Sequence, residues 1–397
     1  MSPEDQLALL KRGTSEIINE KELAEKLEAG KPLVIKAGFD PTAPDIHLGH
    51  TVLLRKLAHF QQLGHKVIFL IGDFTAMIGD PSGQNALRPP LTPQDVLDNA
   101  KTFATQISSI LDLSNLQIRR NSEWLGQMRL ADFLGVSTKM TVPRLLERDD
   151  FTERLKKGDS LTVAESMYPL LQAYDSVALE ADVEIGGVDQ KFNLLMGRVL
   201  QERFEQKPQV VITMPLLEGL DGAQKMSKSL DNYVGIQEAP DQMYGKLMSV
   251  SDALMEKYYE LLTDEDLKQV KTLHPMEAKK QLAALIVKQY HGEAGAKAAT
   301  EHFKNVVQNK ELPSEMEDIT VEAGDPQVTL AQLLELGLAE KAGVKSRGEF
   351  RRLVTQGGIK VDEAPVKDLK HSFDANQTYT LKVGKRKFFK LAIKTGQ

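Results

Sequence analysis

The sequence contains no cysteine among its 397 residues. It therefore offers no disulfide, no thiol nucleophile and no thiolate metal site. It also lacks any run of eighteen apolar residues, and its N-terminal stretch, MSPEDQLALLKRGTSEI, carries charges every few residues instead of an apolar core. We expect neither a membrane span nor a signal peptide, and these absences favour a cytoplasmic protein.

Charge is distributed unevenly along the chain. The net charge of -6 is the sum of a basic C-terminal stretch, residues 341–397, with 14 Lys or Arg and 5 Asp or Glu (+9), and a remainder of -15. Because phosphate attraction is local at physiological salt, such a stretch can bind nucleic acid although the whole chain is acidic. The length exceeds what one hydrophobic core usually supports, so we expect two or three domains.

Strand and helix signals alternate near the N-terminus. Apolar runs at Leu33–Ile35 and Val67–Ile71 flank a Gly/Pro/Asp loop at 38–45 and a helical stretch near 47–63. This pattern predicts a βαβ unit and an α/β fold class with a doubly wound, Rossmann-like parallel sheet. In such folds ligands bind at the carboxyl ends of the strands. We assign residues 1–234 to this domain, with a helical insertion at about 125–182.

The rest of the chain divides into three predicted segments. Helical periodicity indicates a helical domain at 235–311. The acidic stretch LPSEMEDITVEAGD leads us to predict an exposed linker at 312–328. Helical segments followed by strand-like runs predict a small α+β domain at 329–397.

Two short motifs carry groups suited to phosphate. GFDPTAPDIHLGH, residues 38–50, places a Gly- and Pro-rich turn before a predicted helix, where unpaired amides, Gly49 and the imidazoles of His47 and His50 can meet an anion. The polar loop 221–233 carries KMSKS, with Lys225 and Lys228, which can stabilise charge on a leaving pyrophosphate. Taken alone, such a histidine pair is more often solvent-exposed or a helix cap, and such a lysine loop is more often a solvated surface segment. Neither GxxxxGK[ST] nor GxGxxG is present.

Together, HLGH and KMSKS about 175 residues apart resemble the class I aminoacyl-tRNA synthetases. Further stretches resemble tyrosyl-tRNA synthetases: IGDPSG at 78–83, YPLLQAYD at 168–175 and IGGVDQKFN at 185–193. The basic C-terminal stretch resembles the S4-type RNA-binding domain of the bacterial members. The family joins L-tyrosine to ATP as tyrosyl-adenylate, releases pyrophosphate and transfers tyrosine to the 3′ end of tRNA(Tyr). The resemblance also implies a homodimer, and Mg²⁺ that accompanies ATP without a dedicated protein metal site.

The resemblance also implies the residues of the site. The catalytic residues are His47, His50, Lys225 and Lys228, and ATP binding adds Gly49, Ser227, Asp189 and Arg88. Tyrosine binding involves Gly38, Asp40, Asp80, Tyr168, Gln172, Asp175 and Gln190. Tyr168, Gln172 and Asp175 are spaced i, i+4 and i+7 and so share one helical face. Asp175 accepts a hydrogen bond from the substrate phenol, and Tyr168, Gln172 and Asp80 surround the α-ammonium group.

Two positions depart from the family pattern. Lys36 stands where some members have a tyrosine that holds the substrate phenol, so Asp175 is expected to have a different second partner. Gln84 stands where family members often have a lysine directly after GDPSG, a cation expected near pyrophosphate. Arg88 is expected to compensate for the missing charge. We interpret Trp124 as a packing residue.

In the basic C-terminal stretch, the resemblance places tRNA contacts at Lys345, Arg347, Arg351, Arg352 and Lys360. A merely basic surface is the alternative for that stretch. For the whole chain the alternatives are a tryptophanyl-tRNA synthetase, which shares both signatures, and a non-catalytic RNA-binding relative. Asp175 and the basic tail argue against the first, and the intact HLGH and KMSKS motifs argue against the second.

Overall fold

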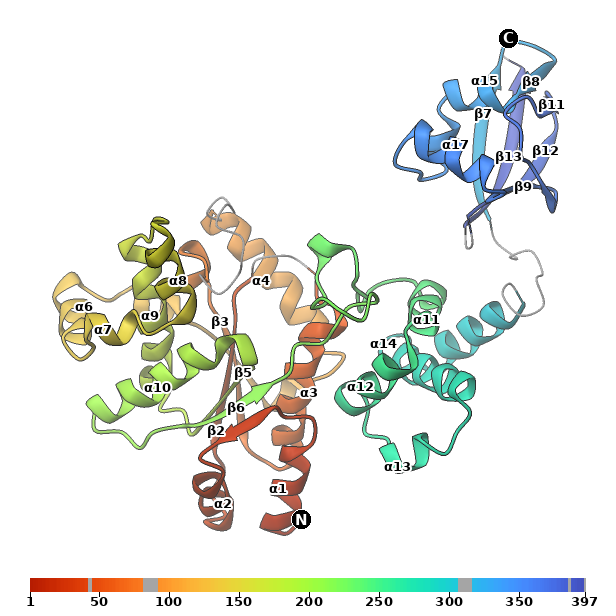
Figure 1. Ribbon diagram of the computed structural model, residues 1–397. Helices are drawn as coiled ribbons and strands as arrows, with labels where there is room; N and C mark the ends of the chain where they lie inside the picture. Colours follow the sequence, from red (N-terminus) through yellow and green to blue (C-terminus); the bar gives the residue numbers. More distant parts are fainter. Residues whose placement is uncertain (42–44, 81–91, 306–315, 385–386, 396–397) are drawn as a thin grey trace. The chain divides into compact units, whose positions relative to one another are not determined.

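The computed structural model describes residues 1–41, 45–80, 92–305, 316–384 and 387–395. The chain forms two compact units, Met1–Thr300 and Glu301–Gln397 (Figure 1). Within the described residues, no helix is both long enough and apolar enough to cross a membrane.

A six-stranded sheet forms the centre of the N-terminal unit, with the order β1-β6-β5-β2-β3-β4. All neighbouring strands are parallel except β1, which is antiparallel to β6. The chain builds outward from β2 through β3 to β4 and then returns to β5 and β6, so the topological switch point lies between β2 and β5. The predicted doubly wound fold is confirmed. The strands are β1 (Glu16–Ile18), β2 (Val34–Phe39), β3 (Lys66–Ile71), β4 (Leu116–Arg120), β5 (Val183–Gly187) and β6 (Val210–Met214).

Helices cover this sheet (Figure 1). The segment between β4 and β5, which the sequence predicts to be helical, contains α5 to α9. Helix α9 carries the YPLLQAYD stretch and packs along α10. The helices are α1 (Pro3–Lys11), α2 (Glu20–Glu28), α3 (Leu48–Gln62), α4 (Pro93–Ile107), α5 (Ser122–Leu125), α6 (Leu130–Ser137), α7 (Val142–Leu145), α8 (Asp149–Lys157), α9 (Val163–Ala178) and α10 (Lys191–Arg203).

Four more helices follow the lysine loop: α11 (Pro240–Met248), α12 (Asp252–Leu262), α13 (Leu267–Val270) and α14 (Pro275–Phe303). Their predicted helical character is confirmed. As far as Thr300 they belong to the same compact unit as the sheet, in part because α12 packs against α3.

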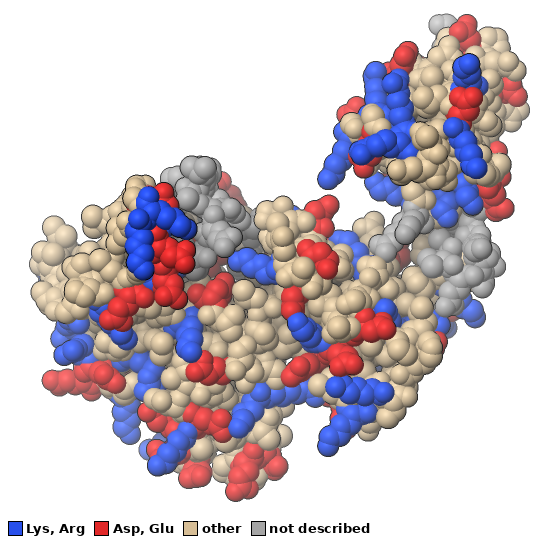
Figure 2. Space-filling model, in the orientation of Figure 1, with Lys and Arg blue, Asp and Glu red and all other residues tan. Residues whose placement is uncertain are grey.

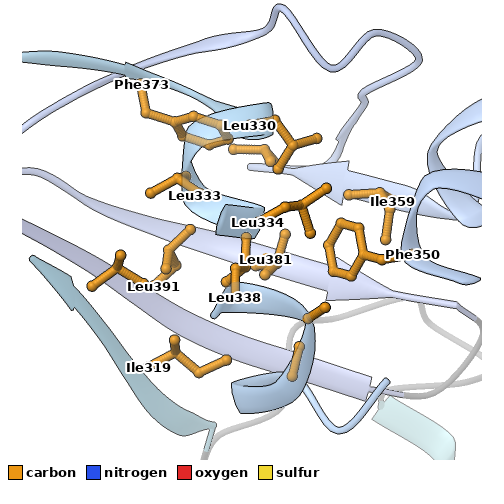
Figure 3. Close-up of a cluster of buried hydrophobic side chains, with 14 of the residues drawn as sticks. Ile319, Leu330, Leu333, Leu334, Leu338, Phe350, Ile359, Phe373, Leu381 and Leu391 are labelled. Atoms are coloured by element: carbon orange, nitrogen blue, oxygen red, sulfur yellow. The ribbon is translucent and has the colours of Figure 1, made fainter. Parts of the chain in front are cut away.

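The C-terminal unit has its own sheet, in the order β10-β9-β12-β13-β7, and a small sheet of β11 and β8. Leucine and phenylalanine side chains from its helices and strands form one core, in which Leu330, Leu334, Phe350, Leu381 and Leu391 are buried (Figure 3). The elements are β7 (Glu317–Ala323), β8 (Gln327–Thr329), α15 (Leu330–Glu335), α16 (Leu338–Lys341), α17 (Arg347–Thr355), β9 (Ile359–Val361), β10 (Ala364–Pro365), β11 (Ser372–Asp374), β12 (Thr378–Val383) and β13 (Lys387–Thr395).

The predicted linker at 312–328 is wrong over much of its length. Residues 317–323 form β7, which pairs in parallel with β13, and residues 327–329 form β8. Within EDITVEA the apolar side chains of Ile319, Val321 and Ala323 are buried, whereas the polar side chains between them, Thr320 and Glu322, are exposed. This alternation has the period of a strand. The acidic composition of this stretch led to the prediction of a linker although its alternation is that of a strand.

Candidate active site

The histidine motif lies at the start of α3, which follows β2 at the carboxyl edge of the sheet. His47 is the N-cap of α3, and its Nδ1 accepts a hydrogen bond from the amide of Gly49 (3.2 Å). The Nδ1 of His50 accepts from the amide of His47 (3.2 Å). The two rings stack with their centroids 3.8 Å apart. Because both Nδ1 atoms accept, each neutral ring carries its proton on Nε2 and can donate from there.

Both imidazoles are neutral at physiological pH. Burial lowers the pKa of His47 to about 3, with further contributions from His50 and Lys228. Burial also lowers the pKa of His50 to about 4, again helped by Lys228. The histidines therefore offer hydrogen-bond donors, and positive charge at this edge comes from other residues.

The lysine loop lies directly against the histidine motif. The amide of Leu48 donates to the carbonyl of Val234 (3.0 Å), and His47 pairs with Gly235 as an isolated β-bridge. An added Cβ at Gly49 would lie 3.5 Å from the Cβ of Met226. The Nζ of Lys228 forms an ion pair with Asp45 (2.9 Å). The HLGH and KMSKS motifs therefore lie next to each other at the same edge of the sheet.

Asn232 anchors the lysine loop from within. Its Oδ1 accepts from the amide of Ser227 (2.8 Å), and its Nδ2 donates to Asp221 (2.9 Å) and to the carbonyl of Lys225 (3.2 Å). The side chain is buried, as is that of Met226. The loop predicted from its polar composition is therefore held at its centre. Sequence reasoning missed Asn232, because a lone asparagine after KMSKS gives no signal of its own.

Asp189, at the end of β5, belongs to the same region. Burial raises its pKa and the positive charge of Lys225 lowers it, so the two side chains are electrically coupled. The predicted ATP residues His47, Gly49, His50, Lys225, Ser227, Lys228 and Asp189 are all among the described residues, whereas Arg88 and Gln84 lie outside them.

A second group of polar side chains starts from α9. The hydroxyl of Tyr168 donates to Asp40 Oδ2 (2.8 Å), and Thr75 donates to Asp40 Oδ1 (2.9 Å). Burial raises the pKa of Asp40 to about 7, although the hydrogen bonds from Tyr168 and Thr75 oppose the shift. A Cβ added at Gly72 would lie 2.0 Å from Asp40, so only glycine fits there. Gly38 is different, because an added Cβ would meet nothing within 4 Å.

Asp175 lies deeper on the same face of α9 and is 2% exposed. The indole Nε1 of Trp124 donates to its Oδ1 (2.8 Å), and Asn121 donates to its Oδ2 (3.4 Å). Burial raises the pKa of Asp175 to about 7. Trp124 does pack against the buried cluster of Ile68, Leu70 and Leu179, and its indole N–H in addition holds the carboxylate that the sequence singles out.

An amide chain joins the remaining predicted residues. Asn193 donates to Gln172 Oε1 (3.0 Å) and to Gln190 Oε1 (3.1 Å), and Gln190 donates to Asp80 Oδ2 (2.6 Å). The buried Arg148 lies 3.6 Å from Asp80 and donates to Asn193 (3.2 Å). Asp80, Gln172 and Gln190 are brought together as predicted. Asn193 and Arg148 were missed because neither belongs to a motif.

The described part of the chain contains no group of three or more His, Cys, Asp or Glu side chains that could hold a metal ion.

A doubly wound sheet with a histidine-capped helix and a lysine loop at its carboxyl edge is the arrangement of a class I aminoacyl-tRNA synthetase. The family described as "tRNA synthetases class I (W and Y)" matches residues 28–308. The tyrosine–tRNA ligase of Geobacter sulfurreducens is 52% identical over 99% of this chain and 100% of its own length, and that of Thermotoga maritima is 47% identical over 99% and 98%. The chain belongs to the tyrosine–tRNA ligase family.

Solved structures support the fold. The tyrosyl-tRNA synthetase of Archaeoglobus fulgidus, determined with L-tyrosine, has a TM-score of 0.62 at 23% identity and covers 76% of this chain and 100% of its own. A truncated mitochondrial tyrosyl-tRNA synthetase of Aspergillus nidulans has a TM-score of 0.65 at 22% identity, covering 77% and 94%.

The function follows from the family. The enzyme activates L-tyrosine with ATP and charges tRNA with it. The alternatives of a tryptophanyl enzyme and of a non-catalytic relative are thereby set aside.

Proposed function

We propose that the two motifs divide the work on ATP between neutral donors and cations. His47 and His50 bind phosphate oxygens through Nε2–H beside the amides of α3, and Gly49 leaves room for the nucleotide. Lys225 and Lys228, with Ser227, bind the pyrophosphate side. The observation that carries this division is that both histidines are neutral and stacked next to Lys228.

No protein nucleophile is required for either step. A carboxylate oxygen of tyrosine attacks the α-phosphorus, the bond from that phosphorus to the bridging oxygen breaks, and pyrophosphate leaves with the electron pair. In the second step a ribose hydroxyl of the terminal adenosine attacks the tyrosyl carbonyl carbon, and AMP leaves. Lys225 and Lys228 stabilise the charge that grows on pyrophosphate, and this lowers the barrier because the charge is greater in the transition state.

Mg²⁺ accompanies ATP in this proposal. Phosphate oxygens of ATP would supply most of its ligands. Asp189 is placed at the ribose. Arg88 remains assigned to the pyrophosphate side, in a stretch outside the described residues.

The polar side chains on and around α9 form the tyrosine site in this proposal. Asp175 accepts a hydrogen bond from the substrate phenol, while Asp80, Tyr168, Gln172 and Gln190 surround its ammonium group near Asp40 and Gly38. Phenylalanine would leave the buried Asp175 without that donor, which is costly. Discrimination against phenylalanine by tyrosyl-tRNA synthetases is a standard illustration of this effect, so its size is not a new expectation.

The test of the site is tyrosine-dependent exchange of pyrophosphate into ATP. Lys225→Met and His50→Gln should lower kcat while leaving the Kd of L-tyrosine unchanged. Lys207→Met is the matched control, because Lys207 is exposed and precedes β6 at the opposite edge of the sheet. If kcat for exchange falls equally in Lys207→Met, or stays unchanged in Lys225→Met, the roles proposed for Lys225 and His50 are wrong.

We also propose that the C-terminal unit is an S4-like domain that binds tRNA(Tyr) and that the enzyme works in the cytoplasm, where its tRNA is found. Lys345, Arg347, Arg351 and Arg352 are exposed on α17 or just before it, and the side chains of Phe350 and Val354 on this helix are buried in the core. Lys360 is exposed on β9. Lys and Arg side chains gather on the side of this unit that carries α17 (Figure 2). They would contact the tRNA backbone.

The helices between β4 and β5 support the proposed homodimer. Large apolar side chains are exposed along them: Leu130 (73%), Leu134 (54%), Val142 (66%), Leu155 (49%) and Val163 (74%). Several large apolar side chains exposed on one segment suit burial against a second copy of the chain. Val142→Glu should convert dimers to monomers in light scattering, whereas the control Leu336→Glu, in the C-terminal unit, should not. A monomeric parent protein would overturn the proposal.

A further inference from the structure

Lys36 is completely buried at the switch point of the sheet, beneath the helix that carries the tyrosine site. It lies on β2, and its neighbour across the parallel pair with β5 is Glu184. The Nζ of Lys36 is 2.9 Å from Glu184 Oε1. Two buried charges of opposite sign therefore sit side by side in the centre of the unit.

The same ammonium group reaches up to α9. It donates to Ser176 Oγ (2.9 Å) and to the main-chain carbonyl of Gln172 (3.3 Å). Ser176 in turn donates to Glu184 Oε2 (3.0 Å), which also accepts from Gln209. Lys36 thus holds the turn of α9 whose ends carry Gln172 and Asp175.

The network has no spare room. A Cβ added at Gly197 of α10 would lie 2.5 Å from Gln209 Nε2 and 3.0 Å from Ser176 Oγ. Taking a lysine and a glutamate out of water costs free energy, and their mutual attraction often does not recover this cost. Well-packed apolar residues in the same place often make a protein as stable or more stable. The pair is therefore a poor device for stability alone, and its position suggests a role toward its neighbour Asp175.

We propose that Lys36 is a positioning and specificity-determining residue of the tyrosine site: through Ser176 and Gln172 it fixes the turn of α9 that presents Asp175 to the substrate phenol, and its positive charge favours the carboxylate form of Asp175. The proposal rests on the proposed role of Asp175. Lys36 acts through Asp175 and does not touch the substrate in this scheme.

The electrostatics agree with this geometry. After burial, which raises the pKa of Asp175, the next influence is Lys36, which lowers it, and Glu184 raises it. From the other elements around the carboxylate, Trp124 and Asn121 lower that pKa through hydrogen bonds. Two further charged or titratable neighbours, Asp40 and Tyr168, are themselves coupled to Asp175.

The test measures how strongly the enzyme prefers L-tyrosine over L-phenylalanine as the pH changes, from the Kd of each by calorimetry. Taking the ratio of the two Kd values cancels the titration of Asp40, which both ligands share. In the parent enzyme the preference should fall as the pH drops and Asp175 takes up a proton.

The variants are chosen to shift the pH at which half of the preference for tyrosine is lost, called the midpoint here, in opposite directions. Lys36→Met should raise it by about 1 to 3 pH units, because a neighbouring cation is lost. Glu184→Gln should lower it, and the double variant should return it toward the parent value. A purely structural ion pair would predict no opposite shifts. If Lys36→Met does not fold, the downward shift in Glu184→Gln still decides the matter.

Asp175→Asn separates the two ways of failing. It should abolish the pH dependence of the preference. If it does, while Lys36→Met and Glu184→Gln leave the midpoint unchanged, the role of Lys36 is overturned and that of Asp175 stands. If Asp175→Asn keeps the parent preference and its pH dependence, the proposed tyrosine site itself is wrong.

Discussion

The indole Nε1 of Trp124 donates a 2.8 Å hydrogen bond to Oδ1 of the buried Asp175. The only tryptophan of the chain therefore orients the carboxylate assigned to the substrate phenol. Trp124→Phe keeps an aromatic ring but removes this donor. Since a hydrogen bond to a charged group contributes about 1.5–3 kcal/mol, we expect the KM for tyrosine to rise roughly 10- to 100-fold. The KM for ATP, measured in the same exchange assay, is the control and should stay the same. An unchanged KM for tyrosine would refute this role.

The titration of Asp175 predicts a stability effect with a definite sign. Burial raises its pKa from 3.8 to about 7, so the folded protein holds this proton more tightly than the unfolded chain. The corresponding stability is present below about pH 4 and is lost as the pH rises through about 7. Asp175→Asn cannot ionise, so its melting temperature relative to the parent should increase between pH 4.5 and pH 8. Thermal denaturation of both ligand-free proteins at these pH values checks this. A constant difference would contradict it.

Asn232 should matter for catalysis more than for tyrosine binding. Asn232→Ala removes the three hydrogen bonds that hold Ser227, Asp221 and Lys225 in the lysine loop. Because small displacements of positioning groups are costly, kcat for exchange should fall by about 10- to 100-fold. The Kd of tyrosine should not change. Ser229→Ala, at an exposed position of the same loop, serves as the control. If both variants lose the same activity, the anchoring role of Asn232 is not supported.

In the proposed site, the ion pair between Asp45 and Lys228 would compete with pyrophosphate for the lysine. Asp45→Asn removes the competing charge, and the side chain of Asp45 is 55% exposed, so the pair is weak. We expect the KM for ATP to fall by no more than about fivefold, with the largest effect at low salt. Exchange rates at several ATP and salt concentrations measure this. A rise in the KM for ATP would mean that Asp45 instead holds Lys228 in its productive position.

Removal of the C-terminal unit should separate the two steps of the reaction. A chain that ends before Glu317 loses β7 together with the rest of that sheet, whereas the unit Met1–Thr300 retains its contacts. Tyrosine-dependent exchange should persist, and charging of tRNA should fall by about 100-fold or more, because the phosphate contacts are lost. Normal charging by this truncated protein would show that the basic surface on α17 is not needed for tRNA.

The sequence predicts best where function depends on neighbours along the chain. The helix start at His47 and the i, i+4, i+7 spacing of Tyr168, Gln172 and Asp175 are local patterns, and both occupy the predicted elements. The hydrogen bond of Trp124 was missed because its partner, Asp175, lies 51 residues away. The partners of Arg148 and Asn193 are likewise set by tertiary packing rather than by a motif. Such contacts leave no periodic trace in the sequence.

The pairing of β7 with β13 has a consequence for how the protein is made. The first strand of the C-terminal unit pairs along its length with the last described strand, and the partner of Glu317 is Phe389, 72 residues later in the chain. During synthesis β7 has no neighbouring strand in this sheet until β13 has emerged from the ribosome. The N-terminal unit can fold during synthesis, since domains generally fold as units from the N-terminus. The sheet of the C-terminal unit can close only after β13 has left the ribosome, so this unit completes its fold later than the unit Met1–Thr300.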